Sequence, residues 1–167
     1  FGSYARYWVE SFRLPHLSRE VVRAGFRADG YEHIVEGLSH GQGVILALPH
    51  LGGWEWAGRW MVDQGHPLTV VVERLGNDAL FEWFRSLRAD LGMNVIPVGP
   101  EAGTAVSRAL KANEVVCLLC DRDLQGNGVE VDFFGERTTL PGGPALLSLR
   151  SGAPVLPVAV YFTDRYN

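Results

Sequence analysis

The chain has 167 residues, which is room for one domain with a sizeable core. Apolar residues make up 47% and charged residues 20%, a composition typical of folded protein. The net charge of −4 argues against nucleic acid as a partner, because binding to phosphates requires a basic surface. No apolar run reaches the roughly 18 residues of a membrane-spanning helix. Two cysteines are too few for a disulfide framework, so a reducing, cytoplasmic setting is expected.

The first 27 residues are basic, with five arginines against two glutamates, which leaves the remaining chain at −7 for the total of −4. Tyr4, Trp8 and Phe12 are spaced four apart, which places them on one face of a helix. A basic helix with an aromatic stripe can lie in a lipid interface. The same stripe on an ordinary surface helix would pack against the core, and the spacing alone leaves both interpretations open.

Strand-like and helix-like segments then alternate along the chain. Val44–Leu48 is a continuous apolar run between glycines, the pattern of a strand buried on both faces. Asn77 is a suitable N-cap for the helix that follows it, and Gly152 a suitable end for another. The predicted strands are 44–48, 68–72, 93–98, 115–120, 129–134 and 154–162, and the predicted helices are 54–64, 78–90, 104–112 and 144–150.

This alternation predicts an α/β fold, with a mainly parallel central sheet flanked by helices. We expect residues 1–167 to form a single domain. Because the chain begins with Phe1 and ends at Asn167 soon after a strand-like run, we also expect a fragment that lacks both ends of a longer polypeptide.

Polar residues follow three of the predicted strands directly, and the carboxyl ends of parallel strands meet at one edge of a sheet. His50 follows the first strand, Glu73 and Arg74 follow the second, and the run 121–123 follows the fourth. We therefore expect these side chains to converge on one rim.

His50 and Glu55 are the strongest candidates for chemistry. A carboxylate five residues after a histidine can keep one imidazole nitrogen protonated and leave the other free as a base. Gly52 and Gly53 lie between them and would let the chain turn tightly and bring its amides close to a substrate. The alternative is a capping histidine followed by an ordinary first-turn glutamate.

Two short motifs do not lead to a function. The G-x-S-x-G run 37–41 precedes a predicted strand, whereas a nucleophilic serine in that motif follows one. Cys117 and Cys120 match C-x-x-C, but within a strand their side chains would point to opposite faces. We therefore expect two core cysteines.

Asp121 and Asp123 form a D-x-D motif at a strand end, which can hold a divalent cation against a diphosphate, as in nucleotide-sugar glycosyltransferases. A metal-dependent glycosyltransferase is therefore the alternative function. In the other interpretation, these carboxylates pair with Arg122 or with nearby arginines at an ordinary strand terminus.

Residues 50–55, His-Leu-Gly-Gly-Trp-Glu, resemble the H-x₄-[DE] signature of glycerolipid acyltransferases, in the form found in lipid A-type lauroyl acyltransferases. The resemblance continues in order over roughly residues 40–160 and is closest to the branch that acts on phosphatidylinositol mannosides. Gly53 and Arg122 depart from the lipid A enzymes, which weighs against a lipid A acceptor. The further matching residues are Glu73-Arg74, Arg88, Asp121-Arg122, Phe133-Phe134-Gly135, Gly143-Pro144-Ala145 and the run 151–158.

The resemblance implies transfer of a fatty acyl group from acyl-CoA to a mannose hydroxyl of a phosphatidylinositol mannoside. The reaction would take place on the anionic cytoplasmic face of the inner membrane, without a cofactor or metal, and residues 1–27 would face the membrane. A non-catalytic lipid-binding module with the same fold is a third possibility. By position, His50 would be the general base and Glu55 would orient it, with substrate contacts from Arg88, Glu73, Arg74, Glu130 and Arg137.

Overall fold

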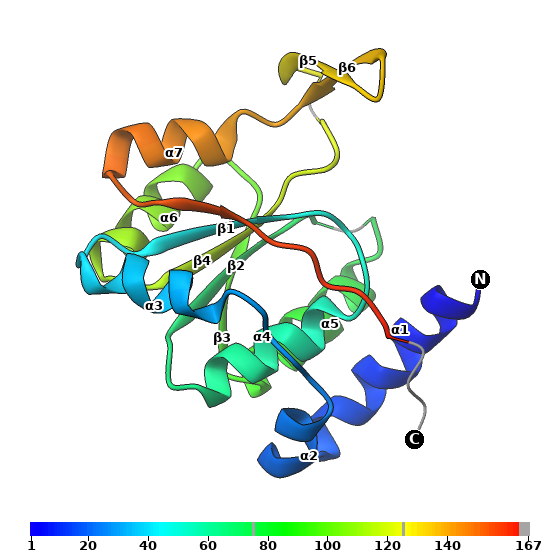
Figure 1. The fold of residues 1–167 in the computed structure, drawn as a ribbon. Coiled ribbons are helices and arrows are strands. Elements are labelled where there is room, and N and C mark those ends of the chain that lie inside the picture. Colours follow the sequence, from blue (N-terminus) through cyan, green and yellow to red (C-terminus); the bar gives the residue numbers. More distant parts are fainter. Residues whose placement is uncertain (75, 125, 164–167) are drawn as a thin grey trace.

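The computed structural model describes residues 1–74, 76–124 and 126–163. Figure 1 shows a parallel sheet with helices on both faces, which confirms the α/β prediction. The elements in chain order are α1 (Gly2–Arg13), η1 (Leu14–His16), α2 (Arg19–Ala24), α3 (Tyr31–Ser39), β1 (Val44–Leu48), α4 (Trp54–Asp63), β2 (Leu68–Val72), α5 (Asp78–Asp90), β3 (Met93–Pro97), α6 (Ala102–Lys111), β4 (Val115–Leu119), β5 (Val129–Phe133), β6 (Glu136–Leu140), α7 (Gly143–Ser151) and β7 (Val155–Pro157).

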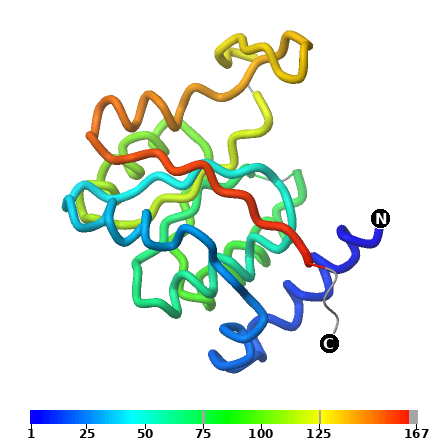
Figure 2. The backbone as a smooth tube through the Cα atoms, viewed as in Figure 1, coloured from blue at the N-terminus to red at the C-terminus, as the bar shows by residue number. Residues whose placement is uncertain are grey.

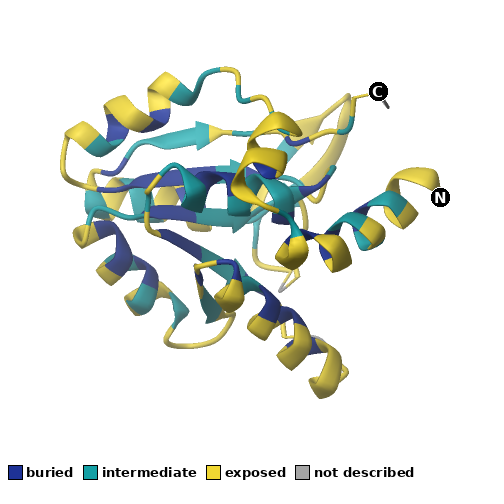
Figure 3. Cartoon of the chain, turned by 90° about the horizontal axis from the view of Figure 1, so that it is seen from below, coloured by how far each residue is buried: buried dark blue, intermediate teal, exposed yellow. Residues whose placement is uncertain are grey.

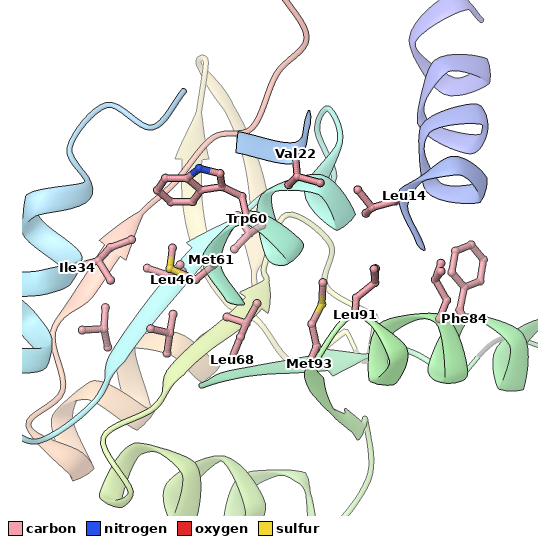
Figure 4. Packing of buried hydrophobic residues seen from close by; sticks show 14 residues of the cluster. Leu14, Val22, Ile34, Leu46, Trp60, Met61, Leu68, Phe84, Leu91 and Met93 are labelled. Atoms are coloured by element: carbon pink, nitrogen blue, oxygen red, sulfur yellow. The ribbon is translucent and has the colours of Figure 1, made fainter. Parts of the chain in front are cut away.

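The main sheet has the strand order β3-β2-β4-β1-β7, and all of its pairs are parallel. Alternate residues of β1 supply the two halves of the core. Leu46 packs with α3, α4 and α5, and its neighbour Ile45 packs with α6 and α7 on the opposite face. Figure 4 shows the larger cluster, in which Trp60 and Met93 bring α4 and β3 together. Both faces of the central strands are thus covered, which explains the continuous apolar runs of β1 and β4.

The predicted caps hold the helices where expected. The Asn77 side chain accepts a hydrogen bond from the Leu80 amide (3.0 Å) at the start of α5. Gly152 ends α7 in the left-handed conformation with φ of 77°.

The N-terminal helical segment consists of three pieces, because Pro15 lies in the turn where α1 ends and cannot donate a backbone hydrogen bond. Tyr7 and Leu14 are buried, whereas Tyr4 and Phe12 of the aromatic stripe are exposed and Trp8 is half-buried. Figure 3 shows this division along α1. None of the helices in the described ranges is both long enough and apolar enough to cross a membrane.

Two strand predictions need correction. The segment 129–134 forms a strand, but it pairs with the unpredicted β6 in a separate antiparallel hairpin that projects from the body of the molecule (Figure 2). The predicted strand 154–162 is a strand only over Val155–Pro157, which pairs with residues 45–47 of β1 at the sheet edge. The residues that follow run as extended chain over the loop that carries His50.

Candidate active site

His50 and Asp121 form the centre of the candidate site. β1 and β4 pair with Leu48 opposite Leu119, so the residues two positions beyond each strand end lie side by side. His50 Nδ1 lies 2.8 Å from Asp121 Oδ1, and the His50 amide donates to Asp121 Oδ2 (3.1 Å). The two carboxylate oxygens therefore hold both the backbone and the ring of the histidine.

This pair leaves His50 Nε2 available for chemistry. Because a carboxylate only accepts hydrogen bonds, Nδ1 carries the proton in the neutral ring and Nε2 carries a lone pair. The side chains of His50 and Asp121 are 35% and 33% exposed, so a substrate can approach. Trp54 packs edge-on against the imidazole, with the ring centroids 5.5 Å apart.

The electrostatics of Asp121 match this arrangement. Partial burial acts to raise the pKa of its carboxyl, but the hydrogen bonds from the His50 ring and amide outweigh burial and lower the pKa below its ordinary value. Asp121 is therefore ionised at neutral pH, as the protonated Nδ1 requires.

The structure does not bring Glu55 to His50, in contrast to the contact expected from the sequence, and pairs it with Arg88 instead. The Glu55 side chain is 3% exposed and faces the interior between α1 and α5, where the carboxylate accepts hydrogen bonds from Arg88 Nη2 (2.5 Å) and Arg88 Nε (3.1 and 3.2 Å). Tyr7 donates a further hydrogen bond to Glu55 Oε1 (3.2 Å). A buried carboxylate requires a paired cation, and Arg88 supplies it.

Arg88 also differs from the prediction of a substrate contact. Its side chain is 15% exposed, and its guanidinium donates hydrogen bonds to the Glu55 carboxylate through Nε and Nη2. Burial acts to lower the pKa of Arg88, but the negative charge of Glu55 raises it above its ordinary value, so the guanidinium stays charged. Together the two residues lock α4 to α5 behind the His50 loop.

The predicted rim is confirmed in part. Glu73, after β2, lies 3.6 Å from Arg122 Nη1, which belongs to the segment after β4. Arg74 instead pairs with Asp78 at the start of α5 (3.4 Å). Substrate contacts by Glu73 and Arg74 stay predictions.

Asp123 serves a different partner from Asp121, although the two are only two residues apart. Its carboxylate accepts hydrogen bonds from the Gly126 amide (3.0 Å), the Gly128 amide (2.9 Å) and the Thr139 hydroxyl (2.8 Å). Asp123 thus fixes the base of the β5–β6 hairpin. In the described residues, no cluster of three or more His, Cys, Asp or Glu side chains could hold a metal ion.

Glu130 and Arg137 pair with each other across the hairpin, 3.1 Å apart, and both are largely exposed. Among the described residues, no hydrogen bond or ion pair joins them to His50 or Asp121. Their contact with a substrate stays a prediction, because the structure does not bring them to the histidine.

The loop between β1 and α4 is tightly confined. Gly52 has φ of 66°, and a Cβ atom there would lie 2.3 Å from the Val160 carbonyl oxygen. Only glycine fits this left-handed position beneath the extended segment after β7. That the amides of Gly52 and Gly53 bind an oxyanion stays a prediction.

Cys117 and Cys120 are free thiols. Burial raises the pKa of Cys117 to about 12. Burial, then the charge of Asp121, raises the pKa of Cys120. Neither thiol is activated as a nucleophile.

The whole chain, residues 1–167, matches the family described as Bacterial lipid A biosynthesis acyltransferase. The chain belongs to this family. It is 44% identical over 168 residues to the phosphatidylinositol mannoside acyltransferase of Mycobacterium tuberculosis (strain ATCC 25618 / H37Rv), an alignment that covers 98% of this chain and 53% of the relative. It is 41% identical over 164 residues to the enzyme of the same name from Mycolicibacterium smegmatis, covering 96% and 54%. The chain thus spans about half the length of these relatives.

Membership of the lipid A acyltransferase family confirms the resemblance recognised in the sequence. Asp121 and Tyr7 contribute to the site in ways that the sequence did not predict. Asp121 was a metal-ligand candidate, yet its position after the strand next to β1 was a signal that it would meet His50. Nothing in the sequence indicated a role for Tyr7, which does not belong to the aromatic stripe of α1. Only the fold brings it to Glu55.

Proposed function

We propose that this protein transfers a fatty acyl group from acyl-CoA to a mannose hydroxyl of a phosphatidylinositol mannoside, at the cytoplasmic face of the inner membrane. Family membership supports the acyl-transfer reaction, and the names of the relatives support the acceptor. The observation that carries the proposal is the His50–Asp121 pair, which leaves a basic nitrogen accessible beside the signature loop.

In the proposed reaction His50 acts as general base. A sugar hydroxyl is a poor nucleophile, so Nε2 removes its proton while the oxygen attacks the thioester carbonyl. The tetrahedral intermediate collapses as the carbon–sulfur bond breaks, and the proton on Nε2 passes to the departing CoA sulfur. Asp121 holds the ring in the required tautomer and stabilises the imidazolium formed between these two steps.

The other residues of the site support the reaction but form and break no covalent bonds in it. The Glu55–Arg88 pair fixes the start of α4, and with it the loop that follows His50. The amides of Gly52 and Gly53 are the proposed donors to the oxyanion of the intermediate. No step passes through a metal or cofactor, and acyl-CoA is a co-substrate.

For the membrane face we propose a surface made by α1 and α5. Tyr4, Phe12 and Trp83 are exposed, and the Phe12 and Trp83 rings contact each other with centroids 5.0 Å apart. The surplus of arginine in residues 1–27 would favour anionic lipid, and the aromatic rings suit the interface.

The test uses the full-length protein with acyl-CoA and purified phosphatidylinositol mannoside in the presence of EDTA. His50→Ala is compared with wild type and with His40→Ala, which removes an exposed histidine at the end of α3. We expect acylated glycolipid from wild type and His40→Ala only. Equal transfer by His50→Ala would remove His50 from the mechanism. Absence of transfer by the wild type both with and without EDTA would contradict the proposed function. Activity that is seen without EDTA and lost when EDTA is added would favour a metal-dependent reaction at Asp121.

A further inference from the structure

Tyr7, on helix α1, packs on Trp54, which begins α4 directly after the loop that carries His50. Tyr7 is 6% exposed, and its ring packs on the indole of Trp54 with centroids 4.4 Å apart. Trp54 in turn packs edge-on against the imidazole of His50, at 5.5 Å. A continuous series of aromatic contacts therefore connects the N-terminal helix to the candidate base.

The imidazole of His50 contacts both Asp121 and Trp54. Its bond to Asp121 fixes Nδ1, but a single hydrogen bond at one edge of a ring does not by itself fix the ring plane. The perpendicular packing of Trp54 supplies a second restraint on the His50 side chain, which is 35% exposed.

Trp54 itself is held by packing rather than by a polar bond. Its Nε1 is buried and has no hydrogen-bond partner among the described residues. A buried indole usually donates to an acceptor that fixes its orientation, and here none does so. The Tyr7 ring is therefore a principal support of Trp54 on the side of α1.

We propose that Tyr7 is a positioning residue, whose ring holds Trp54 against His50 and so sets the orientation of the imidazole. Its effect on turnover rests on the proposed acyl transfer, whereas its effect on the His50 ring does not. Because Tyr7 lies on the buried side of the helix proposed to face the membrane, it links the placement of α1 to the base.

The Tyr7 hydroxyl has a separate, anchoring role. Burial, followed by the negative charge of Glu55, raises the pKa of Tyr7 above its ordinary value, so the phenol stays neutral and donates to Glu55. This bond ties Tyr7 to the Glu55–Arg88 pair, but the contact with Trp54 belongs to the ring.

The hydroxyl and the ring can be tested separately. Tyr7→Phe keeps the ring and removes the hydroxyl, and Tyr7→Leu removes the ring. The matched control is Tyr31→Leu. Tyr31 also packs on a tryptophan of α4, in this case Trp60, and its hydroxyl also makes a hydrogen bond, in this case with His66. Tyr7→Met replaces Tyr7→Leu if the latter does not fold at the assay temperature.

We expect Tyr7→Leu to lower kcat roughly 10- to 100-fold with little change in KM, because a base displaced by about 1 Å loses its approach to the hydroxyl. Tyr7→Phe and Tyr31→Leu should keep kcat within about threefold of wild type. In the Trp54→Leu background, Tyr7→Leu should have no further effect, because Tyr7 acts through Trp54. Additive losses in this cycle, or equal kcat for Tyr7→Leu and Tyr31→Leu, would overturn the proposal.

A second readout needs no substrate. The His50 Nδ1–H proton resonance, assigned by its loss in His50→Gln, reports how firmly the ring is held on Asp121. It should broaden by exchange with water in Tyr7→Leu and stay sharp in Tyr7→Phe and Tyr31→Leu. An unchanged resonance in Tyr7→Leu would overturn the positioning role. If the wild type transfers no acyl group, the proposed function fails while this resonance still decides the role of Tyr7.

Discussion

His50 and Asp121 are 71 positions apart in the chain, yet their side chains lie 2.8 Å apart because their strands are neighbours in the sheet. The carboxylate nearest in sequence, Glu55, turns away to Arg88. The partner of the base is therefore set by strand order rather than by the spacing within the signature.

Replacement of Asp121 tests this relationship directly. Asp121→Asn offers Nδ1 an amide that can present a donor instead of an acceptor, which disfavours the tautomer with a free Nε2. We expect kcat to fall by roughly 10² to 10⁴, the range for a disabled general base, with KM nearly unchanged. Asp132→Asn, an exposed carboxylate of the hairpin, is the control and should match wild type. Full activity of Asp121→Asn would contradict the pair.

The same substitution has a pH-dependent effect on stability. The pKa of Asp121 is lowered in the folded protein, so the ionised carboxylate stabilises the fold above the unfolded value of 3.8. This contribution is lost as the pH falls through the lower folded-state pKa. Wild type should therefore exceed Asp121→Asn in free energy of unfolding near neutral pH, and the difference should shrink below about pH 4. Urea unfolding at a series of pH values measures it, and a difference independent of pH would contradict the prediction.

Glu55 and Arg88 should act chiefly on stability. Glu55→Gln leaves a buried guanidinium without its counter-charge, which costs on the order of 3–5 kcal/mol. Arg88→Met leaves the buried carboxylate unpaired, with a similar cost, and the double variant should lose much less than the sum of the two. Arg137→Ala, which breaks an exposed pair, is the control at about 0–1 kcal/mol. Additive losses in a denaturant series would show that the two residues do not form a coupled pair.

The main sheet could be predicted because β1 and β4 are apolar on both faces and the other strands consist mostly of apolar residues. The hairpin partner β6 could not, since Glu136 and Arg137 begin a strand whose outer half is exposed and lacks alternation. The end of β7 could not be predicted from the sequence either. Apolar residues continue past Pro157, but strand length at a sheet edge depends on what the neighbouring strand offers.

For the site, the sequence predicted that His50 and Asp121 lie at one rim of the sheet but not that they pair. Convergence of His50 and Asp121 follows from parallel strands alone, whereas the choice between Asp121 and Glu55 requires knowing that β4 lies beside β1. The burial of Glu55 depends on α1, which packs over α4 and contributes Tyr7. Neither fact is present in the spacing of residues 50–55.

Gly52 should be intolerant of any side chain. Gly52→Ala places a Cβ atom 2.3 Å from the Val160 carbonyl oxygen at φ of 66°, so the loop or the segment above it must move. We expect a loss of about 3 kcal/mol in stability, from backbone strain and this clash, together with loss of activity. Gly41→Ala has φ of 74° but no atom within 4 Å of its Cβ, so it reports strain alone, at about 1–2 kcal/mol. Equal losses for the two variants would show that the overlying segment does not confine the His50 loop.

The proposed membrane face predicts which exposed apolar residues matter for lipid binding. Tyr4→Ser combined with Phe12→Ser removes two exposed rings from α1 and should lower binding to vesicles containing phosphatidylinositol roughly tenfold or more, since each ring contributes about 1 kcal/mol at an interface. Leu149→Ser, at an 86% exposed leucine of α7 on the other side of the sheet, is the control and should bind like wild type. Added salt should weaken the binding of the wild type to vesicles only in part. It screens the charges of the arginines in the N-terminal segment but not the contacts of the aromatic rings with lipid. Flotation with the full-length protein measures both effects. Equal loss from the α1 and α7 variants would show that lipid contact is not localised to α1.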